Sequence, residues 1–140
     1  MTTSTAQKIV RWSAIYDLVV TAMFALPWTA VLLFGALAAL HDSLGLSGAT
    51  PSAADPFTLM FANLMGSLVV VWSVYRIWRP TIAAGVADTG ARMLFSLGMI
   101  YALANGASPL TGTLLAMELV WAVVQGAAVV STRRATTAPA

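Results

Sequence analysis

Four long apolar stretches, separated by short polar connections, dominate the pattern of this sequence. They lie near residues 12–40, 56–78, 91–107 and 110–131. About 20 apolar helical residues cross the hydrocarbon core of a bilayer, and backbone groups inside that core must be paired within helices or closed barrels. The pattern predicts an all-α integral membrane protein, a four-helix bundle in which residues 1–140 form a single transmembrane domain.

The ends of the stretches carry signals for helix boundaries. A capping side chain precedes a proline in Asp55-Pro56 and in Ser108-Pro109, which favours helix starts at the second and fourth stretches. We expect Arg79-Pro80 to end the second helix and Asp88 to cap the third, with the glycines of segment 85–90 forming a turn. The tails, residues 1–7 and 135–140, lack apolar periodicity and are predicted to be disordered.

Two of the stretches have unusual lengths. The first contains Pro27, which predicts a kink within one membrane span. A cleaved signal peptide is the alternative, but its apolar region is only about 7–15 residues long, so a retained span is favoured. The third stretch is short for a crossing. Three interpretations are open: shielding by the other helices, accommodation by local thinning and snorkelling of Arg92, or a re-entrant segment.

Composition supports a lipid environment. Hydrophobic residues make up 59% of the chain and charged residues 9%, whereas soluble domains are about 25% charged. There is no basic stripe with interleaved aromatic residues, so nucleic-acid binding is not expected. The chain has no cysteine, which excludes disulfides, thiolate metal sites and cysteine nucleophiles.

The distribution of basic residues predicts the orientation. In a four-span topology, all seven basic residues fall on one side, namely Lys8, Arg11, Arg76, Arg79, Arg92, Arg133 and Arg134. Lys and Arg near span ends are retained on the cytoplasmic side. We therefore expect a multi-pass protein of the bacterial inner (plasma) membrane, with both termini in the cytoplasm.

Polar side chains within the stretches are the candidate functional residues, because such groups are costly in a membrane and usually face the bundle. Asp17 lies about two turns into the first span, at a depth that Arg76 or Arg92 could reach. An ion pair of Asp17 with Arg92 or with Arg76 is expected. The structural interpretation of this pair is preferred to a functional one.

Glu118, near the middle of the fourth span, has no basic residue at its predicted depth. A carboxyl without a cation tends to hold a proton, so it could donate a hydrogen bond, carry a proton or bind a polar headgroup. Helical spacing suggests an amphiphilic, ligand-binding cavity around it, lined by Asn63, Tyr101, Asn105, Trp28, Trp121 and Gln125, with Thr29 as a further possible partner. A purely structural role for Glu118 is equally compatible with the sequence.

No motif indicates an enzyme. There is no nucleotide-binding glycine loop and no nucleophile with a histidine partner. His41 and Asp42 are too few ligands for a zinc or haem site, and we expect them to be solvated in a loop. No metal or cofactor is indicated.

Three segments resemble a family of small, uncharacterised bacterial four-span inner-membrane proteins. They are Tyr16-Asp17-Leu18-Val19-Val20, the Asp55-Pro56 start with Asn63-Leu64, and Glu118-Leu119. The chain is more loosely similar to DoxX-like and EXPERA-type four-helix membrane bundles, some of which are redox-complex subunits or sterol-binding proteins. The looser likeness implies a bundle that holds a ligand.

The sequence thus leads to two main hypotheses. The first is a non-enzymatic bundle in the lipid bilayer that binds a lipophilic small molecule or another membrane protein through its buried polar groups. The alternative is a small proton-coupled transporter that acts as a homodimer. An intramembrane isomerase or oxidoreductase subunit is a third possibility, and it would require a bound cofactor.

Overall fold

The computed structural model describes residues 2–137, with side chains for residues 2–132. Its helices are α1 (Thr3–Thr21), the 3-10 turn η1 (Ala22–Ala25), α2 (Pro27–Ser43), α3 (Pro56–Trp78), α4 (Ile82–Ala104) and α5 (Leu110–Thr137). The described part of the chain contains no strand beyond a single bridge between Ala49 and Ala107. The all-α prediction is confirmed.

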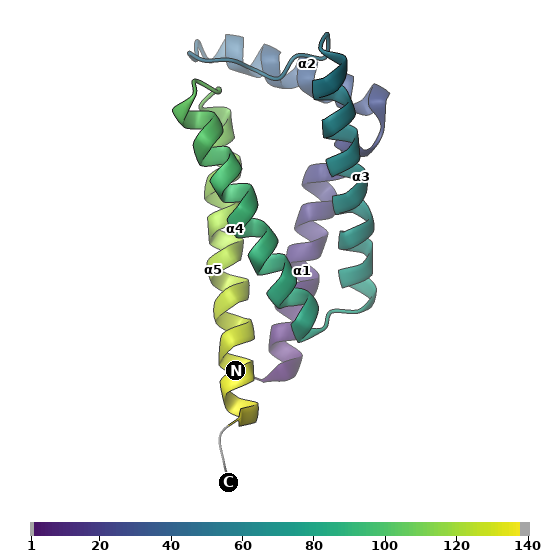
Figure 1. Ribbon diagram of the computed structural model, residues 1–140, viewed down its shortest axis with the longest axis vertical. Coiled ribbons are helices and arrows are strands. Elements are labelled where there is room, and N and C mark those ends of the chain that lie inside the picture. The colour runs from purple at the N-terminus through teal and green to yellow at the C-terminus, as the bar shows by residue number, and fades with distance from the viewer. Residues whose placement is uncertain (1, 138–140) are drawn as a thin grey trace.

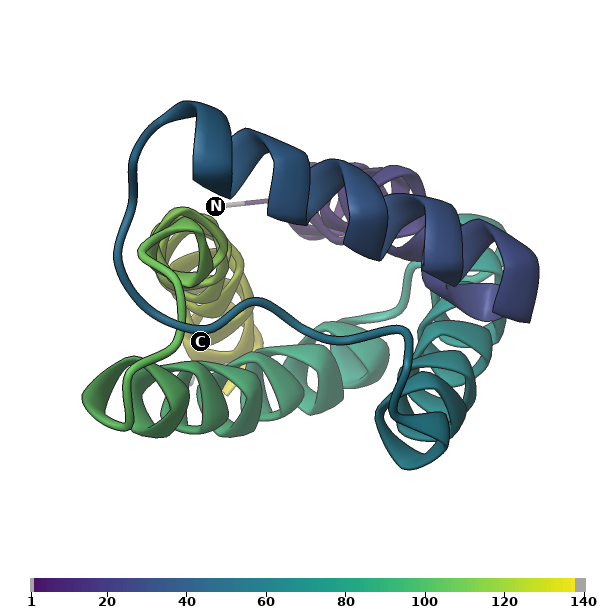
Figure 2. The same ribbon diagram turned by 90° about the horizontal axis from the view of Figure 1, so that it is seen from above.

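Four helices stand side by side and the fifth crosses one end. α1, α3, α4 and α5 are upright in Figure 1, and both ends of the chain lie at the same end of the molecule. α4 packs against α5, and α1 packs against α3 and also contacts α5 and α4. α2 and the segment 44–55 cross the opposite end, as the view from above shows (Figure 2). α2 and the segment 44–55 thus lie across the end of the upright helices that is opposite the two termini.

Two helices are long and apolar enough to cross a membrane by themselves. They are α3 and the part of α5 from Leu110 to Thr132, while α1 and α2 meet the same criteria only as a bent pair. Large apolar side chains such as Leu68, Val71 and Val123 are exposed on α3 and α5. Such extensive exposed apolar surface is expected where lipid covers it.

The first apolar stretch is not one kinked helix. The chain bends by 103° between the segment Thr3–Ala25 and α2, so residues 12–40 are divided between two helices and do not form one kinked helix. Pro27 stands at the first position of α2, where its missing N–H is harmless. A proline kink within a helix leaves the two halves roughly in line, whereas here four residues of tighter helix and an extended Leu26 separate them.

Polar side chains satisfy the carbonyl groups that this break releases. The amide of Asn63 donates to the carbonyl oxygen of Phe24 at 2.8 Å, and the hydroxyl of Ser67 donates to that of Ala25 at 3.2 Å. The hydroxyl of Thr29 donates to the carbonyl oxygen of Met23 at 2.6 Å. Because an unpaired carbonyl at membrane depth is costly, these bonds make the bend compatible with a bilayer.

Two helices start about nine residues earlier than the hydropathy predicted. α1 begins at Thr3, where Thr2 accepts a hydrogen bond from the backbone of Thr5. Residues 3–7 are therefore helical and not part of a disordered tail.

The last helix extends further than the hydropathy predicted. α5 continues to Thr137, so residues 135–137 are helical as well. Residues 138–140 lie outside the described part of the chain.

α4 likewise begins at Ile82, with Thr81 as the cap that accepts from the backbone N–H of Ala84 at 3.1 Å. The segment 85–90 is thus helical and not a turn, and Asp88 lies within the helix instead of capping it. Membrane helices use glycine to allow close contact. At Gly85, a Cβ atom would lie 2.7 Å from Cγ2 of Val10.

The predicted boundaries of α3 are confirmed. The carboxylate of Asp55 accepts hydrogen bonds from the backbone N–H groups of Phe57 at 3.2 Å and Thr58 at 3.0 Å. The Thr58 hydroxyl also donates to this carboxylate. These hydrogen bonds, the one from the hydroxyl most of all, hold the pKa of Asp55 below its ordinary value. α3 ends at Trp78, before Pro80.

Hydrogen bonds connect the crossing segment to the turn between α4 and α5. The N–H of Ala49 donates to the carbonyl of Gly106, and that of Ser108 donates to the carbonyl of Ala49, both at 2.8 Å. His41 lies in the last turn of α2, is buried, and has Nδ1 2.8 Å from the hydroxyl of Ser108. The prediction of a solvated loop is therefore wrong for His41, although Asp42 is exposed.

Candidate functional site

Five charged side chains from the four upright helices meet between them. This charge cluster consists of Asp17 of α1, Arg76 of α3, Asp88 and Arg92 of α4, and Glu118 of α5. It lies where α1, α3, α4 and α5 approach one another, so each upright helix contributes at least one charge.

Arg92 is at the centre of the cluster and contacts all three acids. Its Nη2 lies 2.7 Å from Oδ2 of Asp17, its Nε 3.0 Å from Oδ2 of Asp88, and its Nη1 2.8 Å from Oε2 of Glu118. Its side chain is only 1% exposed. Each nitrogen of this guanidinium therefore has a carboxylate acceptor, as a buried arginine requires.

Arg76 joins two of the same acids from the side of α3. Its Nη1 lies 2.8 Å from Oδ2 of Asp88, and its Nη2 pairs with Asp17. The guanidinium also lies over the ring of Trp72, 5.7 Å from the ring centroid, in the geometry of a cation–π contact. The side chain of Arg76 is completely buried.

Neutral polar groups complete the cluster. The amide of Gln125 donates to Oδ2 of Asp88 at 2.9 Å and to the carbonyl of Gly85 at 3.1 Å. The hydroxyl of Ser13 donates to the Gln125 oxygen, and Trp72 Nε1 donates to Oδ1 of Asp88 at 2.9 Å. Asp88 thus forms ion pairs with both arginines and accepts hydrogen bonds from Arg92, the Gln125 amide and the Trp72 indole.

The charges of the cluster do not balance. Two guanidinium groups face three carboxyl groups, so the cluster carries one excess negative charge when all five side chains are ionised. Glu118 has the most exposed side chain of the three acids, at 15% against 10% for Asp17 and 5% for Asp88. The excess is therefore most accessible at Glu118.

A cavity of about 490 Å³ lies directly against the cluster. Asp17, Asp88, Arg92 and Glu118 form its polar part. Apolar side chains of α1, α3, α4 and α5 line the rest, among them Val20, Phe24, Met65, Leu68, Val69, Phe95, Met99 and Leu114. Apolar cavities of roughly 300–1,000 Å³ with a few polar groups are typical of small-molecule sites.

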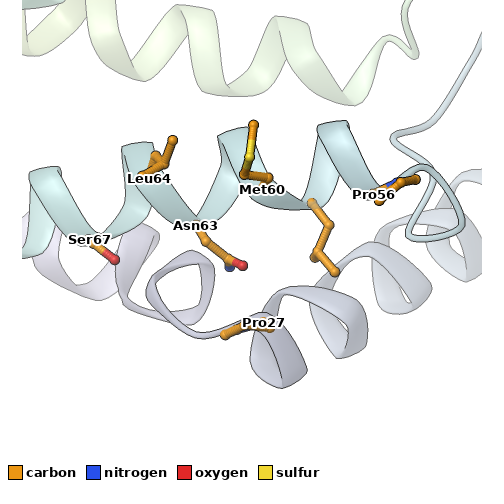
Figure 3. Close-up of a pocket in the computed structure, with 7 residues that line it drawn as sticks. Pro27, Pro56, Met60, Asn63, Leu64 and Ser67 are labelled. Atoms are coloured by element: carbon orange, nitrogen blue, oxygen red, sulfur yellow. The ribbon is translucent and has the colours of Figure 1, made fainter.

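A second, more open groove of about 400 Å³ follows the N-terminal half of α3, beside the break between η1 and α2. Figure 3 shows Asn63 and Ser67 directed from α3 toward this break, with Pro27 and Pro56 at its sides. The amide N–H of Asn63 and the hydroxyl of Ser67 donate to backbone carbonyls there. These polar groups therefore maintain the bend, and the groove offers mainly apolar surface.

The structure brings together the residues expected to form the ion pair. Asp17 contacts both Arg76 and Arg92, where the sequence had favoured one or the other. Asp17 is thus held by two cations at once.

The expectation that Glu118 has no cation is wrong, because Arg92 lies 2.8 Å from it. The cause is the early start of α4. With Ile82 as its first residue, α4 places Arg92 three turns into the helix and not at its end. Arg92 is thereby moved along the helix axis to the level of Glu118.

Most of the other residues predicted to line a cavity with Glu118 lie elsewhere. The side chains of Tyr101 and Trp28 are 71% and 65% exposed. Asn105 is exposed and bonds to the carbonyl of Tyr101. Trp121 is partly buried and contacts the ring of Tyr16, 5.8 Å between centroids.

Two predicted cavity residues have hydrogen-bonding roles instead. Gln125 is completely buried in the charge cluster, and Asn63 holds the break before α2. Thr29 also bonds at that break. Of the predicted ligand-binding set, Glu118 alone is among the residues lining the 490 Å³ cavity.

Sequence reasoning missed Asp88 and Trp72. Asp88 was predicted to cap a helix, and Trp72 was not among the predicted site residues. A signal was nevertheless present, because Asp88 and Arg92 are four residues apart, the spacing of an ion pair on a helix. That spacing would have indicated a helix running through segment 85–90.

Comparisons of the chain with protein-family models, curated proteins and solved structures give no match. The resemblance to small four-span bacterial proteins therefore stays a prediction.

Proposed function

We propose that this protein is a non-enzymatic membrane protein that binds a lipophilic small molecule in the 490 Å³ cavity. The observation that carries the proposal is the cavity's composition, apolar along its walls and charged at one end. A ligand with an apolar body and one polar headgroup matches this division. The walls would bury the body, and Glu118 would contact the headgroup.

The proposed topology has four spans, with α1, α3, α4 and α5 crossing the inner membrane of a bacterium and both termini in the cytoplasm. The common end of the two termini in Figure 1 supports it, as does the positive-inside distribution of the basic residues. The charge cluster would then lie between the helices, away from lipid. α2 would lie along the outer surface of the membrane.

Native mass spectrometry after gentle extraction tests ligand binding. The intact protein is expected to retain a lipophilic molecule of discrete mass. Ala91→Trp places an indole in the cavity, since Ala91 lines it, and should abolish retention. Ala83→Trp is the matched control, because Ala83 is exposed on the same helix outside the lining. Equal retention by both variants would argue against the cavity as the site.

Proton-coupled transport by a homodimer is the second candidate function. The excess carboxylate of the charge cluster favours it, because a transporter needs a group that exchanges a proton at membrane depth. Reconstituted liposomes with a pH gradient and a fluorescent pH indicator provide the test. Substrate-dependent proton flux is expected for a transporter, and its absence across a panel of lipophilic substrates would leave ligand binding alone.

A further inference from the structure

We infer that the ligand of this cavity is a lipophilic organic monocation, and that a proton on the charge cluster replaces it when the cavity is free of ligand. The inference rests on the proposed ligand-binding function and specifies the class of ligand. It follows from the charge of the cluster, the availability of its polar atoms and the chemistry of the cavity walls.

The charge of the cluster favours a ligand with one positive charge. The cluster has three carboxyl groups and two guanidinium groups, and an uncompensated charge is costly in a medium of low dielectric constant. A single positive charge in the cavity would neutralise it. An anionic ligand would double the imbalance, and a neutral ligand would leave it unchanged.

The polar atoms available in the cavity also favour a cation. Every nitrogen of the Arg92 guanidinium already faces a carboxylate, and both terminal nitrogens of Arg76 have acceptors. Nε of Arg76 has no hydrogen-bond partner, but Arg76 does not line the cavity. An anionic headgroup in the cavity would therefore have to displace an existing ion pair. Glu118 contacts Arg92 through Oε2, so its second oxygen, Oε1, can accept from or approach a cation in the cavity.

The lining of the cavity suits an organic cation better than a metal ion. Metal ions need several oxygen, nitrogen or sulfur ligands, and no group of three metal-binding side chains is present among the described residues. The cavity walls are largely apolar, with the aromatic rings of Phe24 and Phe95 among them. Aromatic faces attract alkylammonium groups, and the apolar walls would bury an alkyl chain.

Exchange with a proton follows from the same balance. With the cavity free of ligand, one proton on the Glu118 carboxyl makes the cluster neutral. When a monocation enters, this proton leaves to solvent, so the total charge is the same on both sides of the exchange. The titratable and charged groups around Glu118 are Tyr16 and Asp17 of α1, Arg76 of α3, and Asp88 and Arg92 of α4.

The test compares three probes with one alkyl chain and different headgroups. They are decyltrimethylammonium, 1-decanol and decanoate, titrated calorimetrically into the natural protein in phosphatidylcholine nanodiscs, with empty nanodiscs subtracted. At about pH 8, where few protons compete with the cation, the cation should bind roughly tenfold more tightly than the alcohol, a difference that one ion pair provides. Decanoate should bind most weakly.

Two further measurements identify the cluster as the cause. Lowering the pH to about 5 should weaken cation binding but not alcohol binding, because protons then compete for the carboxyl. Glu118→Gln removes the excess charge and should bring the affinities of the cation and the alcohol to within about twofold. Asp42→Asn, an exposed acid outside the cavity, should leave the preference unchanged.

Each outcome has a separate meaning. Equal affinity for the cation and the alcohol, or a cation preference that survives Glu118→Gln, overturns the inference while ligand binding stands. No binding of any probe overturns the proposed function itself. If Glu118→Gln fails to fold by circular dichroism, the pH titration of the natural protein decides, since a pH-independent cation preference contradicts proton exchange.

Discussion

At the scale of single residues, Arg92 determines how this protein tolerates charge in its interior. It is 1% exposed and contacts Asp17, Asp88 and Glu118. A buried ion pair contributes little net stability compared with apolar packing, but loss of one partner leaves an uncompensated charge. The cost of burying the three acids therefore depends on this guanidinium and on Arg76 beside it.

We predict that Arg92→Met lowers the free energy of unfolding by about 3–5 kcal/mol, because three carboxyl groups then share one cation. Circular dichroism during thermal unfolding in detergent measures the loss. Arg79→Met is the control, since Arg79 is exposed just after α3 and its removal should change stability by no more than about 0.5 kcal/mol.

The same experiment has an internal check. Adding Glu118→Gln to Arg92→Met removes one of the unpaired acids and should restore part of the lost stability, since neighbouring charges are not additive. If Arg92→Met melted like Arg79→Met, the charge cluster would not be formed as described.

At the scale of elements, the break between α1 and α2 is the feature that separates this fold from a simple four-helix bundle. α3 approaches η1 closely at Gly66, where a Cβ atom would lie 2.5 Å from the carbonyl carbon of Phe24 and 2.7 Å from the backbone nitrogen of Ala25. Backbone atoms cannot rotate away as a side chain can. Gly66 therefore allows the contact through which Asn63 and Ser67 reach the released carbonyls.

We predict that Gly66→Ala destabilises the protein by about 1–3 kcal/mol, as overpacking usually does, and loosens the bend. Thermal unfolding measures the first effect, and hydrogen exchange in residues 22–27 measures the second. Gly98→Ala is the matched control, because a Cβ there meets nothing within 4 Å and alanine is the better helix former. Equal behaviour of the two variants would exclude a close contact between α3 and η1.

At the scale of the whole molecule, the charge cluster and the cavity exist only because four helices converge. No helix carries more than two of the five charges. The cavity lies against the cluster and is lined by residues of all four upright helices. The orientation of the protein in the membrane would then decide which side of the bilayer the end crossed by α2 faces.

The absence of cysteine from the natural sequence makes this orientation measurable. Single cysteines are introduced by Ser4→Cys, Ser47→Cys and Ala83→Cys, all at exposed positions. We predict that a membrane-impermeant maleimide labels Ser47→Cys in intact spheroplasts and labels the other two only after permeabilisation, because basic residues stay inside. Equal labelling of Ser4→Cys and Ser47→Cys would contradict the four-span topology.

The sequence by itself determined the helical class, the boundaries of α3 and the chemical character of the interior. These properties depend on local signals, such as the Asp55 cap before Pro56 and the run of apolar residues that follows. The partners of Asp17 also followed from depth along the helices. Hydropathy failed where polar residues belong to a helix, as at residues 3–11 and 82–90, because it identifies helices by their contact with lipid.

Tertiary structure alone decided the rest. The 103° bend after α1 depends on side chains of α3 that are distant in sequence. The pairing of Glu118 with Arg92 depends on how far α4 extends and how it lies against α5. A buried charge is stable only beside its partners, and those partners come from different helices, so their meeting is a property of the packed molecule.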